Sequence, residues 1–310
     1  MARPSAGEAA GVRAAAPADG IEIRPLRSHD ELQACLALQR ETWGDAPGTL
    51  VPTPLLLVVQ RIGGVSAGAF DRDGRLLGFV FGMTGVERGM LVHWSDMLAV
   101  RPEARDRGVG RRLKEYQRDA VIPLGVRRIY WTFDPLVAKN AYFNLDMLGG
   151  QVWEYVPDMY GDTGSPMHEG LGTDRIIVAW LIGDEPDEPD EPDEPDERRP
   201  GGSQRGRRGR RARRGAAEDR SQRASTYRSA PVLNPDGAEF EFSGYAAERV
   251  RIEIPLDIFD VRARSVEVAR RWRESSRAAF GWALEQGYDV EGVERDREDG
   301  RAYYLLSRVP

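Results

Sequence analysis

One segment of the chain reads as a strand, a tight turn and a helix in immediate succession. Residues 97–100 are apolar, residues 105–110 read Arg-Asp-Arg-Gly-Val-Gly, and a helix with a periodic apolar face follows. The start of a helix offers unpaired backbone N–H groups and the positive end of its dipole, and both favour an anion. Gly108 and Gly110 carry no side chain, so a pyrophosphate can approach the main chain closely. The segment therefore predicts a site for a ligand that contains a diphosphate.

Two other phosphate-binding motifs do not fit this segment. A P-loop needs Gly-x-x-x-x-Gly-Lys-Ser/Thr, which the sequence lacks. A dinucleotide-binding turn needs a third glycine where Leu113 stands and an acidic residue that ends the next strand. Asp134 does end that strand, but Pro135 follows it, and the order of strands and helices is not doubly wound. The remaining pattern, Arg-x-x-Gly-x-Gly after a Val-x-Pro strand end, resembles motif A of the GNAT acyltransferase superfamily.

Hydrophobic patterning from residue 21 to about residue 182 extends this resemblance. It predicts a strand, a helix, three strands, a helix, a strand, a helix and two strands, which is the GNAT order. The predicted strands lie at 21–24, 64–70, 75–84, 91–100, 129–133, 151–156 and 175–182, and the helices near 32–38, 109–124 and 140–148. One face of the second helix is predicted to carry Val109, Leu113, Tyr116, Ala120 and Leu124. The resemblance implies a mixed α/β (α+β) fold, with a mostly antiparallel sheet flanked by helices.

Three further motifs narrow the likeness. They are Trp-Thr-Phe-Asp-Pro-Leu at 131–136, Asn-Ala-Tyr-Phe-Asn-Leu at 140–145 and Gly-Thr-Asp-Arg at 172–175. With Gln117 and Arg118 they look like a largely uncharacterised bacterial GNAT subfamily of predicted acetyltransferases. The resemblance implies an N-acetyltransferase that moves an acetyl group from acetyl-CoA to the amine of a small molecule by direct attack, without a metal. Another acyl-CoA, such as succinyl-CoA, is the alternative donor.

Cysteine content and the length of apolar runs indicate the cellular compartment and the class of protein. Cys35 is the sole cysteine, which rules out a disulfide within the chain and predicts a cytoplasmic protein. Cys35 lies on the apolar face of the first predicted helix, which favours a packing role. The longest clean apolar run, residues 55–59, is too short to cross a membrane. Arg13 and Pro17 interrupt the alanine-rich residues 1–20, which are predicted to be a disordered tail.

A charged, disordered linker is predicted at 184–235, between a GNAT acyl-CoA-binding domain at 21–183 and a C-terminal extension at 236–310. Asp184–Glu197 repeats Glu-Pro-Asp, and Arg205–Arg214 carries seven arginines. Neither stretch can bury apolar surface, and regular prolines forbid a helix. One interpretation is nucleic-acid contact through the arginines. The net charge of −6 favours the other interpretation, a solvated spacer whose acidic half neutralises its basic half.

The C-terminal extension is predicted to be a small α/β unit of strand, helix, strand and strand. The strands lie at 250–254, 289–295 and 302–307, and the long helix at 266–283. A unit of about 60 residues is small for an independent domain. We therefore expect it to dock on the acyltransferase core and to extend or cover its substrate side.

The resemblance also implies where an acyl-CoA binds. Its pantetheine arm would pair like an extra strand with the main chain of Leu98–Val100, which would offer a backbone N–H to the thioester oxygen. Its pyrophosphate would lie against residues 105–110, and arginines there add positive charge, although ordinary surface arginine is the alternative. The candidate cofactor-binding residues are Leu98, Ala99, Val100, Arg105, Asp106, Arg107, Gly108, Val109, Gly110, Arg111, Asn140 and Asn144.

The candidate general base lies on the strand before the turn. Strand alternation places Trp94, Asp96, Leu98 and Val100 on one face and His93, as a packed histidine, on the other. The resemblance implies a carboxylate on this strand a few residues before the turn. Trp94 occupies the commonest such position, which is a departure from the family pattern. Asp96 lies two residues on and is the first candidate for the base. The alternative is a structural carboxylate bonded to a neighbouring serine or arginine.

The candidate proton donor does not lie at the position that the family pattern gives. The family pattern has an asparagine and a thiolate-protonating tyrosine where this chain has Ala138 and Leu145. Tyr142 lies one turn earlier, and Asn140 and Asn144 lie one turn apart on a single predicted helix face. Tyr142 is therefore the candidate acid, and the amides are candidates for cofactor contacts. The alternative is a core tyrosine with surface amides.

Four residues are candidates for contact with the substrate. Glu41 ends the first predicted helix beside the expected substrate mouth, and Trp94 faces the same space. The loop between the last two core strands is too long for a simple connection and predicts contacts from Tyr160 and Arg175. A role of Asp174 and Arg175 in loop architecture is the alternative. The missing tyrosine keeps open a non-catalytic acyl-CoA sensor or scaffold, and a homodimer is also left open.

Overall fold

The structure is a computed structural model that describes residues 19–45, 48–161, 171–183, 223, 225–239 and 247–308. The predicted N-terminal tail as far as residue 18, and residues 184–222 of the predicted linker, lie outside these ranges.

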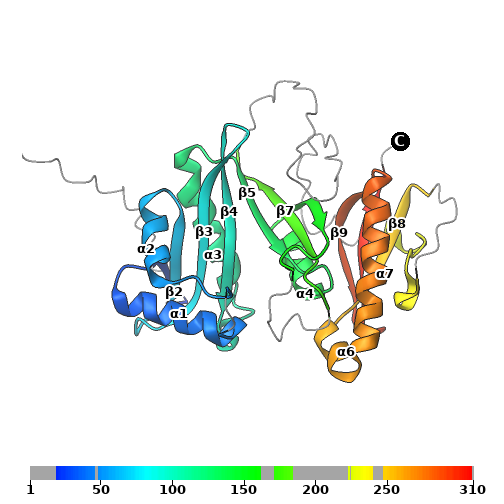
Figure 1. The fold of residues 1–310 in the computed structure, drawn as a ribbon, viewed down its shortest axis with the longest axis horizontal. Helices are drawn as coiled ribbons and strands as arrows, with labels where there is room; N and C mark the ends of the chain where they lie inside the picture. Colours follow the sequence, from blue (N-terminus) through cyan, green and yellow to red (C-terminus); the bar gives the residue numbers. More distant parts are fainter. Residues whose placement is uncertain are drawn as a thin grey trace, which may run out of the picture.

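Seven strands form one mixed sheet in the order β1-β2-β3-β4-β5-β7-β6 (Figure 1). They are β1 (Glu22–Pro25), β2 (Val65–Phe70), β3 (Leu76–Glu87), β4 (Met90–Val100), β5 (Arg128–Phe133), β6 (Gln151–Val156) and β7 (Arg175–Leu181). Neighbouring strands run antiparallel except β4 and β5, which pair in parallel. The predicted fold class, a mostly antiparallel sheet flanked by helices, is confirmed.

Helices cover both faces of the sheet. On one face, α1 (His29–Trp43) and α2 (Thr53–Arg61) pack on β2, β3 and β4, while α3 (Val109–Val121) covers the other (Figure 1). The sequence did not predict α2, because apolar residues occupy its exposed side as well as its buried side. Cys35 of α1 is buried as expected, and burial raises the pKa of its thiol to about 12.

The buried face of α3 differs from the predicted one. The helix ends at Val121, because Pro123 in the following 3-10 turn cannot donate a helical hydrogen bond. Leu124 and Ala120, both predicted to be buried, are exposed. The residues that the helix does bury are Val109, Leu113, Lys114, Gln117 and Val121. Two polar side chains, those of Lys114 and Gln117, therefore face the sheet.

The C-terminal unit is a second, three-stranded antiparallel sheet with a helical layer. Its strands, in the order β8-β10-β9, are β8 (Arg249–Pro255), β9 (Asp289–Asp296) and β10 (Arg301–Ser307). The long α7 (Val266–Glu285) packs on this sheet, and α6 (Ile258–Arg264), which was not predicted, precedes α7. Residues 225–235 were predicted as linker, but Tyr227 and Leu233 are buried in this unit. The amide of Asn234 fixes them by pairing with both main-chain groups of Glu253.

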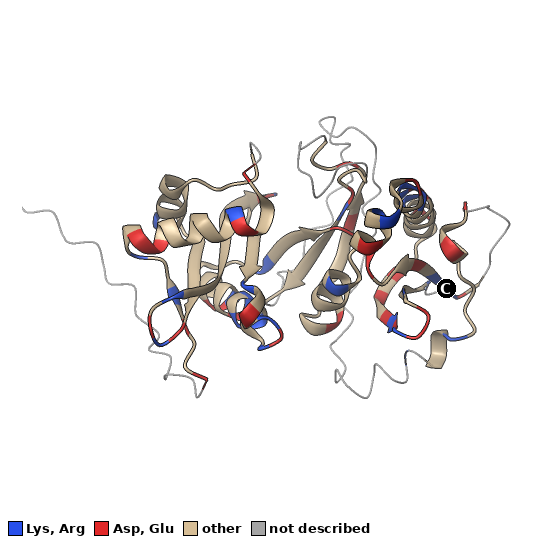
Figure 2. Cartoon of the chain, turned by 90° about the horizontal axis from the view of Figure 1, so that it is seen from below, with Lys and Arg blue, Asp and Glu red and all other residues tan. Residues whose placement is uncertain are grey.

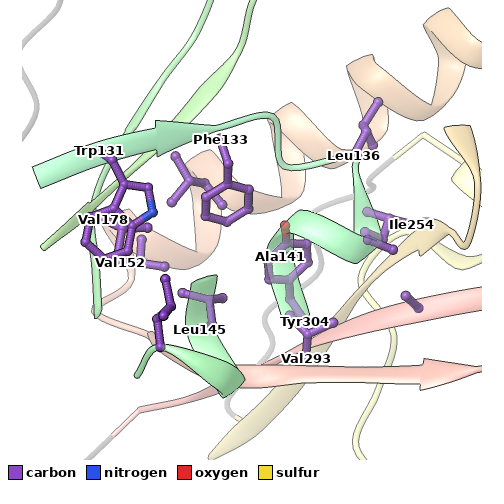
Figure 3. Close-up of a cluster of buried hydrophobic side chains, with 14 of the residues drawn as sticks. Trp131, Phe133, Leu136, Ala141, Leu145, Val152, Val178, Ile254, Val293 and Tyr304 are labelled. Atoms are coloured by element: carbon purple, nitrogen blue, oxygen red, sulfur yellow. The ribbon is translucent and has the colours of Figure 1, made fainter. Parts of the chain in front are cut away.

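The two units share one hydrophobic core, so the expected docking is confirmed. Figure 3 shows Leu145 of the first unit beside Val293 and Tyr304 of the second. Between the units lie α4 (Ala138–Tyr142) and the π turn that follows it, Phe143–Met147. The Tyr304 hydroxyl donates to the Pro135 carbonyl at 2.7 Å.

Charge on the described part of the chain is mixed rather than segregated. Figure 2 shows basic and acidic residues interspersed along the ribbon of both units. The segregated arginine tract of the sequence, Arg205–Arg214, lies outside the described residues. Within the described ranges, no helix combines the length and the apolar composition needed to cross a membrane.

Candidate active site

A bulge in β4 shapes the candidate site. Phe81 of β3 pairs with Met97, whereas the next residue, Gly82, pairs with Ser95. Asp96 is therefore an extra residue in β4, opposite no single residue of β3. A bulge of this kind bends the strand and shifts the alternation of its side chains by one position.

This shift corrects the predicted faces of β4. Trp94 packs beside Tyr130, with 6.3 Å between the ring centroids, on the face away from α3. Asp96 accepts a hydrogen bond from the Trp94 side chain and so stays with it. Leu98 and Val100 instead face α3. The prediction that all four residues share one face is wrong because the bulge intervenes.

The strands β4 and β5 separate at this bulge. They pair over Val92–Trp94 and Arg128–Tyr130, and no further pair joins residues 95–100 to residues 131–133, all of which are described. The facing edges therefore have backbone N–H and C=O groups available for another partner. An extended chain that hydrogen-bonds like a strand fits such a gap.

The electrostatics of Asp96 suit a base. The residue is exposed at the bulge, yet partial desolvation raises the pKa of its carboxyl above the usual value, while the hydrogen bond from Trp94 opposes the shift. Ser95, one proposed structural partner, is engaged by Lys114 instead. No ion pair involves Asp96 within the described residues. A carboxylate with a raised pKa accepts a proton more readily than an ordinary one.

The turn after β4 has the backbone that close approach of a ligand requires. Gly108 begins α3 in the left-handed region, with φ at 74°, and no side chain caps the N–H groups of the first helical turn. A Cβ on Gly110 would lie 3.7 Å from both Phe143 and Val100, which is ordinary contact. Alanine therefore fits at Gly110, but a longer side chain would extend into the surroundings of the turn.

Charged side chains surround this turn. Arg105 donates to the last carbonyl of β4 at 3.1 Å, and Arg111 pairs with Glu115 at 2.8 Å. Lys139 of α4 lies 3.8 Å from the Asp106 carboxylate and links the turn to the next helix. The exposed candidates here are Arg105, Asp106, Arg107 and Arg111, whereas Val109 and Ala99 are buried.

A buried lysine beneath the gap was not predicted from the sequence. Lys114 is 3% exposed, donates from Nζ to Ser95 Oγ at 2.7 Å, and lies 4.1 Å from the centre of the Trp131 ring. Burial lowers the pKa of Lys114 to about 7. The available signal was its spacing from Gly110 and Gln117, which places it on the buried side of α3.

His93 is a packed histidine, as predicted. Its ring nitrogens lie 2.9 Å from Thr84 Oγ1 and 3.0 Å from Gln117 Nε2. Burial, and to a lesser degree the charge of Lys114, lowers the pKa of His93 to about 4. The ring is therefore neutral near pH 7.

The candidates on α4 do not share one face. The α-helix ends at Tyr142 and a π turn follows, which changes the angle between successive side chains. Asn140 is exposed, whereas Asn144 is buried and accepts from the Trp131 indole at 2.9 Å. The Tyr142 ring lies 3.8 Å from the guanidinium of Arg295 on β9. The prediction of a shared amide face is wrong, and a catalytic role for Tyr142 stays a prediction.

Two candidate substrate residues meet at the end of β5. The Tyr160 hydroxyl lies 3.1 Å from Thr132 Oγ1, and the Arg175 guanidinium lies 5.2 Å from the Tyr160 ring centre. Arg175 also approaches Asp134 to 3.9 Å and donates to the Asp174 carbonyl at 2.8 Å. Tyr160 is exposed and Arg175 is buried.

Asp174 makes the contacts expected of a residue that shapes the loop between β6 and β7, which was the alternative to substrate binding. It is fully buried and accepts from the Tyr155 hydroxyl at 2.5 Å and from Arg277 Nε at 2.9 Å. Arg277 lies on α7 and also reaches Asp158 at 2.9 Å. The C-terminal unit therefore holds both ends of the loop between β6 and β7.

Glu41 lies apart from that loop. Its carboxylate pairs with Arg101, which also donates to the Leu76 carbonyl at 2.9 Å. Glu41 thus ties α1 to the end of β4. Across the described residues, no group of three or more His, Cys, Asp or Glu side chains is placed to hold a metal ion.

No protein-family model and no curated protein sequence matches this chain. Similar solved structures include the ribosomal-protein-S18-alanine N-acetyltransferase of Escherichia coli, at 18% identity and a TM-score of 0.41, covering 54% of this chain and 97% of that one. NAA60 of Arabidopsis thaliana, bound to a bisubstrate analogue, has 16% identity and a TM-score of 0.43, covering 53% and 99%. An aminoglycoside 6'-acetyltransferase type Ii has 20% identity and a TM-score of 0.41, covering 54% and 99%.

Proposed function

We propose that this protein is an acyl-CoA-dependent N-acyltransferase that acetylates the amine of a small molecule. The observation that carries this proposal is the position of Asp96, an accessible carboxylate at the apex of the gap between β4 and β5. The strand on one side of that gap runs directly into the glycine turn of α3. The candidate base, the open edge of β4 and the glycine turn therefore follow one another along a single segment.

The turn suits the diphosphate of the donor. The free N–H groups at the start of α3 point along the helix axis toward the turn, where the helix dipole is positive. The exposed Arg105, Arg107 and Arg111 add charge-assisted hydrogen bonds. The open edges of β4 and β5 are suited to an amide-containing pantetheine arm, with Leu98 and Val100 beside it.

The position of Asp96 at the bulge and the raised pKa of its carboxyl support a role as general base. Asp96 would remove a proton from the acceptor amine as the nitrogen attacks the thioester carbonyl, and the bond between carbon and sulfur then breaks. Trp94 holds the carboxylate by a hydrogen bond. Direct attack requires no nucleophilic side chain at this point.

The acceptor would enter on the face that carries Trp94 and Asp96, with Tyr160 and Arg175 at the end of β5. Acetyl-CoA is the default donor because no feature of the site demands a longer acyl chain. Arg175 supports succinyl-CoA as the alternative, since a guanidinium can pair with a second carboxylate.

Calorimetry and turnover test this proposal together. Acetyl-CoA should bind the full chain with measurable heat, and Gly110→Glu should abolish that heat by placing a carboxylate in the turn. Gly85→Glu is the matched control, because Gly85 lies on β3 with no atom within 4 Å of an added Cβ. The wild-type protein should also release CoA with at least one member of a panel of small primary amines. Binding without turnover on the whole panel would instead indicate a sensor, and absence of heat would overturn the proposal.

A further inference from the structure

An ammonium group lies buried where the sheet opens. Lys114 reaches from α3 to Ser95 on β4 and to the face of Trp131 on β5, one partner on each side of the gap. Within the described residues no carboxylate forms an ion pair with it. A buried lysine is normally paired with an acid, because burying an uncompensated charge costs stability. Its presence here points to a role in chemistry rather than in folding.

Ser95 and Asp96 place two groups on opposite sides of one strand. Ser95 faces α3 and Lys114, whereas Asp96 turns with Trp94 to the other face. A thioester held between β4 and β5 would have the carboxylate on one side and the serine hydroxyl on the other. A base and an acid separated in this way cannot neutralise each other directly.

We propose that Lys114, acting through Ser95, supplies the proton that the departing thiolate needs. This inference rests on the proposed function. As the bond between carbon and sulfur breaks, its electron pair passes to sulfur, and Ser95 Oγ gives its proton to that sulfur. A proton of Lys114 Nζ moves to Oγ in the same step, leaving a neutral amine that regains its proton from solvent. Because Lys114 acts through Ser95, it is a positioning residue.

The surroundings of Lys114 fit this role. The groups that contact it are Ser95 from β4 and Trp131 from β5. His93, which lies 3.0 Å from Gln117 of the same helix, is close enough for the charge of Lys114 to lower its pKa, and it is neutral near pH 7. Burial lowers the pKa of Lys114 to about 7, which is suited to proton donation near neutrality. A tyrosine at position 145 could have given a proton to the thiolate, but this chain has Leu145 there, and Leu145 is a core residue.

Leaving-group dependence distinguishes proton supply from structural support. The full-length wild type, Lys114→Met, Ser95→Ala and Gln117→Leu are compared with the primary amine that the wild type turns over fastest as acceptor and either acetyl-CoA or its selenoester analogue as donor. We expect Lys114→Met and Ser95→Ala to lower turnover of acetyl-CoA by about 100-fold. With the selenoester the loss should shrink to a few-fold, because a selenolate leaves without a proton. Gln117→Leu removes a buried polar group from the same face of α3 and should keep the wild-type ratio between donors.

Each outcome has a separate meaning. If Ser95→Ala and Lys114→Met keep the wild-type ratio between donors, the inference is overturned while the acyltransferase stands. If the wild type turns over neither donor with any amine of the panel, the proposed function fails and this inference falls with it. Ser95→Ala alone decides the matter should Lys114→Met not fold, as judged by its circular dichroism. A further outcome is that the selenoester restores turnover in Tyr142→Phe and not in Lys114→Met or Ser95→Ala. That result would assign the proton to Tyr142 and overturn the inference.

Discussion

Arg273 of α7 donates two hydrogen bonds from Nη2 to the two carboxylate oxygens of Asp134, at 2.8 and 2.7 Å. The two residues lie 139 positions apart in the sequence, one in each unit. Arg273 is also bonded to the Leu171 carbonyl at 2.9 Å, at the start of the segment that leads into β7. This buried pair therefore fixes the C-terminal unit to the end of β5, where Arg175 and Tyr160 also lie.

Removing Arg273 should destabilise the protein strongly. Arg273→Met leaves the Asp134 carboxylate largely buried without its main partner, and loss of one member of such a pair costs about 3 kcal/mol or more. The free energy of unfolding in urea measures this loss. Arg271→Met, an exposed residue of the same helix, is the control and should change that energy by less than about 0.5 kcal/mol. Equal effects of both variants would show that the ion pair does not hold the units together.

Asp96 should control activity from the acidic side. A base works only when deprotonated, and the pKa of Asp96 is raised, so kcat/KM should fall as the pH drops through that pKa. Asp96→Asn should lower turnover by about 100-fold and remove this acid limb, while acetyl-CoA still binds. Asp73→Asn, in the exposed turn between β2 and β3, should behave as the wild type. An unaltered pH profile in Asp96→Asn would assign the base elsewhere.

His93 should make stability depend on pH. Its pKa falls from 6.5 to about 4 on folding, so between those values the unfolded chain binds a proton that the folded chain does not. Stability from this group is therefore complete above pH 6.5 and is lost as the pH falls toward 4, by an amount on the order of 3 kcal/mol. The free energy of unfolding is measured in urea at several pH values. In His93→Gln its slope against pH should lose the part that His93 contributes. His29→Gln, at an exposed position, should keep it, and matching slopes for all three proteins would contradict the assignment.

Local signals predicted most elements of the fold. The Asp71–Gly74 turn marked the hairpin of β2 and β3, and residues 97–114 gave the order of strand, turn and helix at the site. The helix α2 was missed because Leu55 and Val58 are exposed, so the apolar pattern has no helical period. The bulge at Asp96 was missed because β4 carries buried polar residues, and strict alternation offers no sign of an inserted residue.

The contacts of two buried cations were missed for a different reason. Lys114 and Arg273 read as ordinary surface cations in a sequence, since their partners come from other elements. Ser95 lies 19 residues from Lys114, and Asp134 lies far from Arg273. Helical spacing places both cations on buried faces, but only the folded chain shows what they contact.

The turn itself should tolerate asparagine better than alanine at Gly108. With φ at 74°, this residue occupies the left-handed region, where an alanine side chain costs about 1 kcal/mol. Asparagine enters that region more readily than other residues with a Cβ. Urea denaturation should therefore rank the stabilities as wild type, then Gly108→Asn, then Gly108→Ala. Gly85→Ala is the control, because its φ is not positive and its added Cβ would meet nothing within 4 Å. Should Gly108→Ala match the wild type, the helix would begin with a different backbone from the one described, and the case for a diphosphate in this turn would weaken with it.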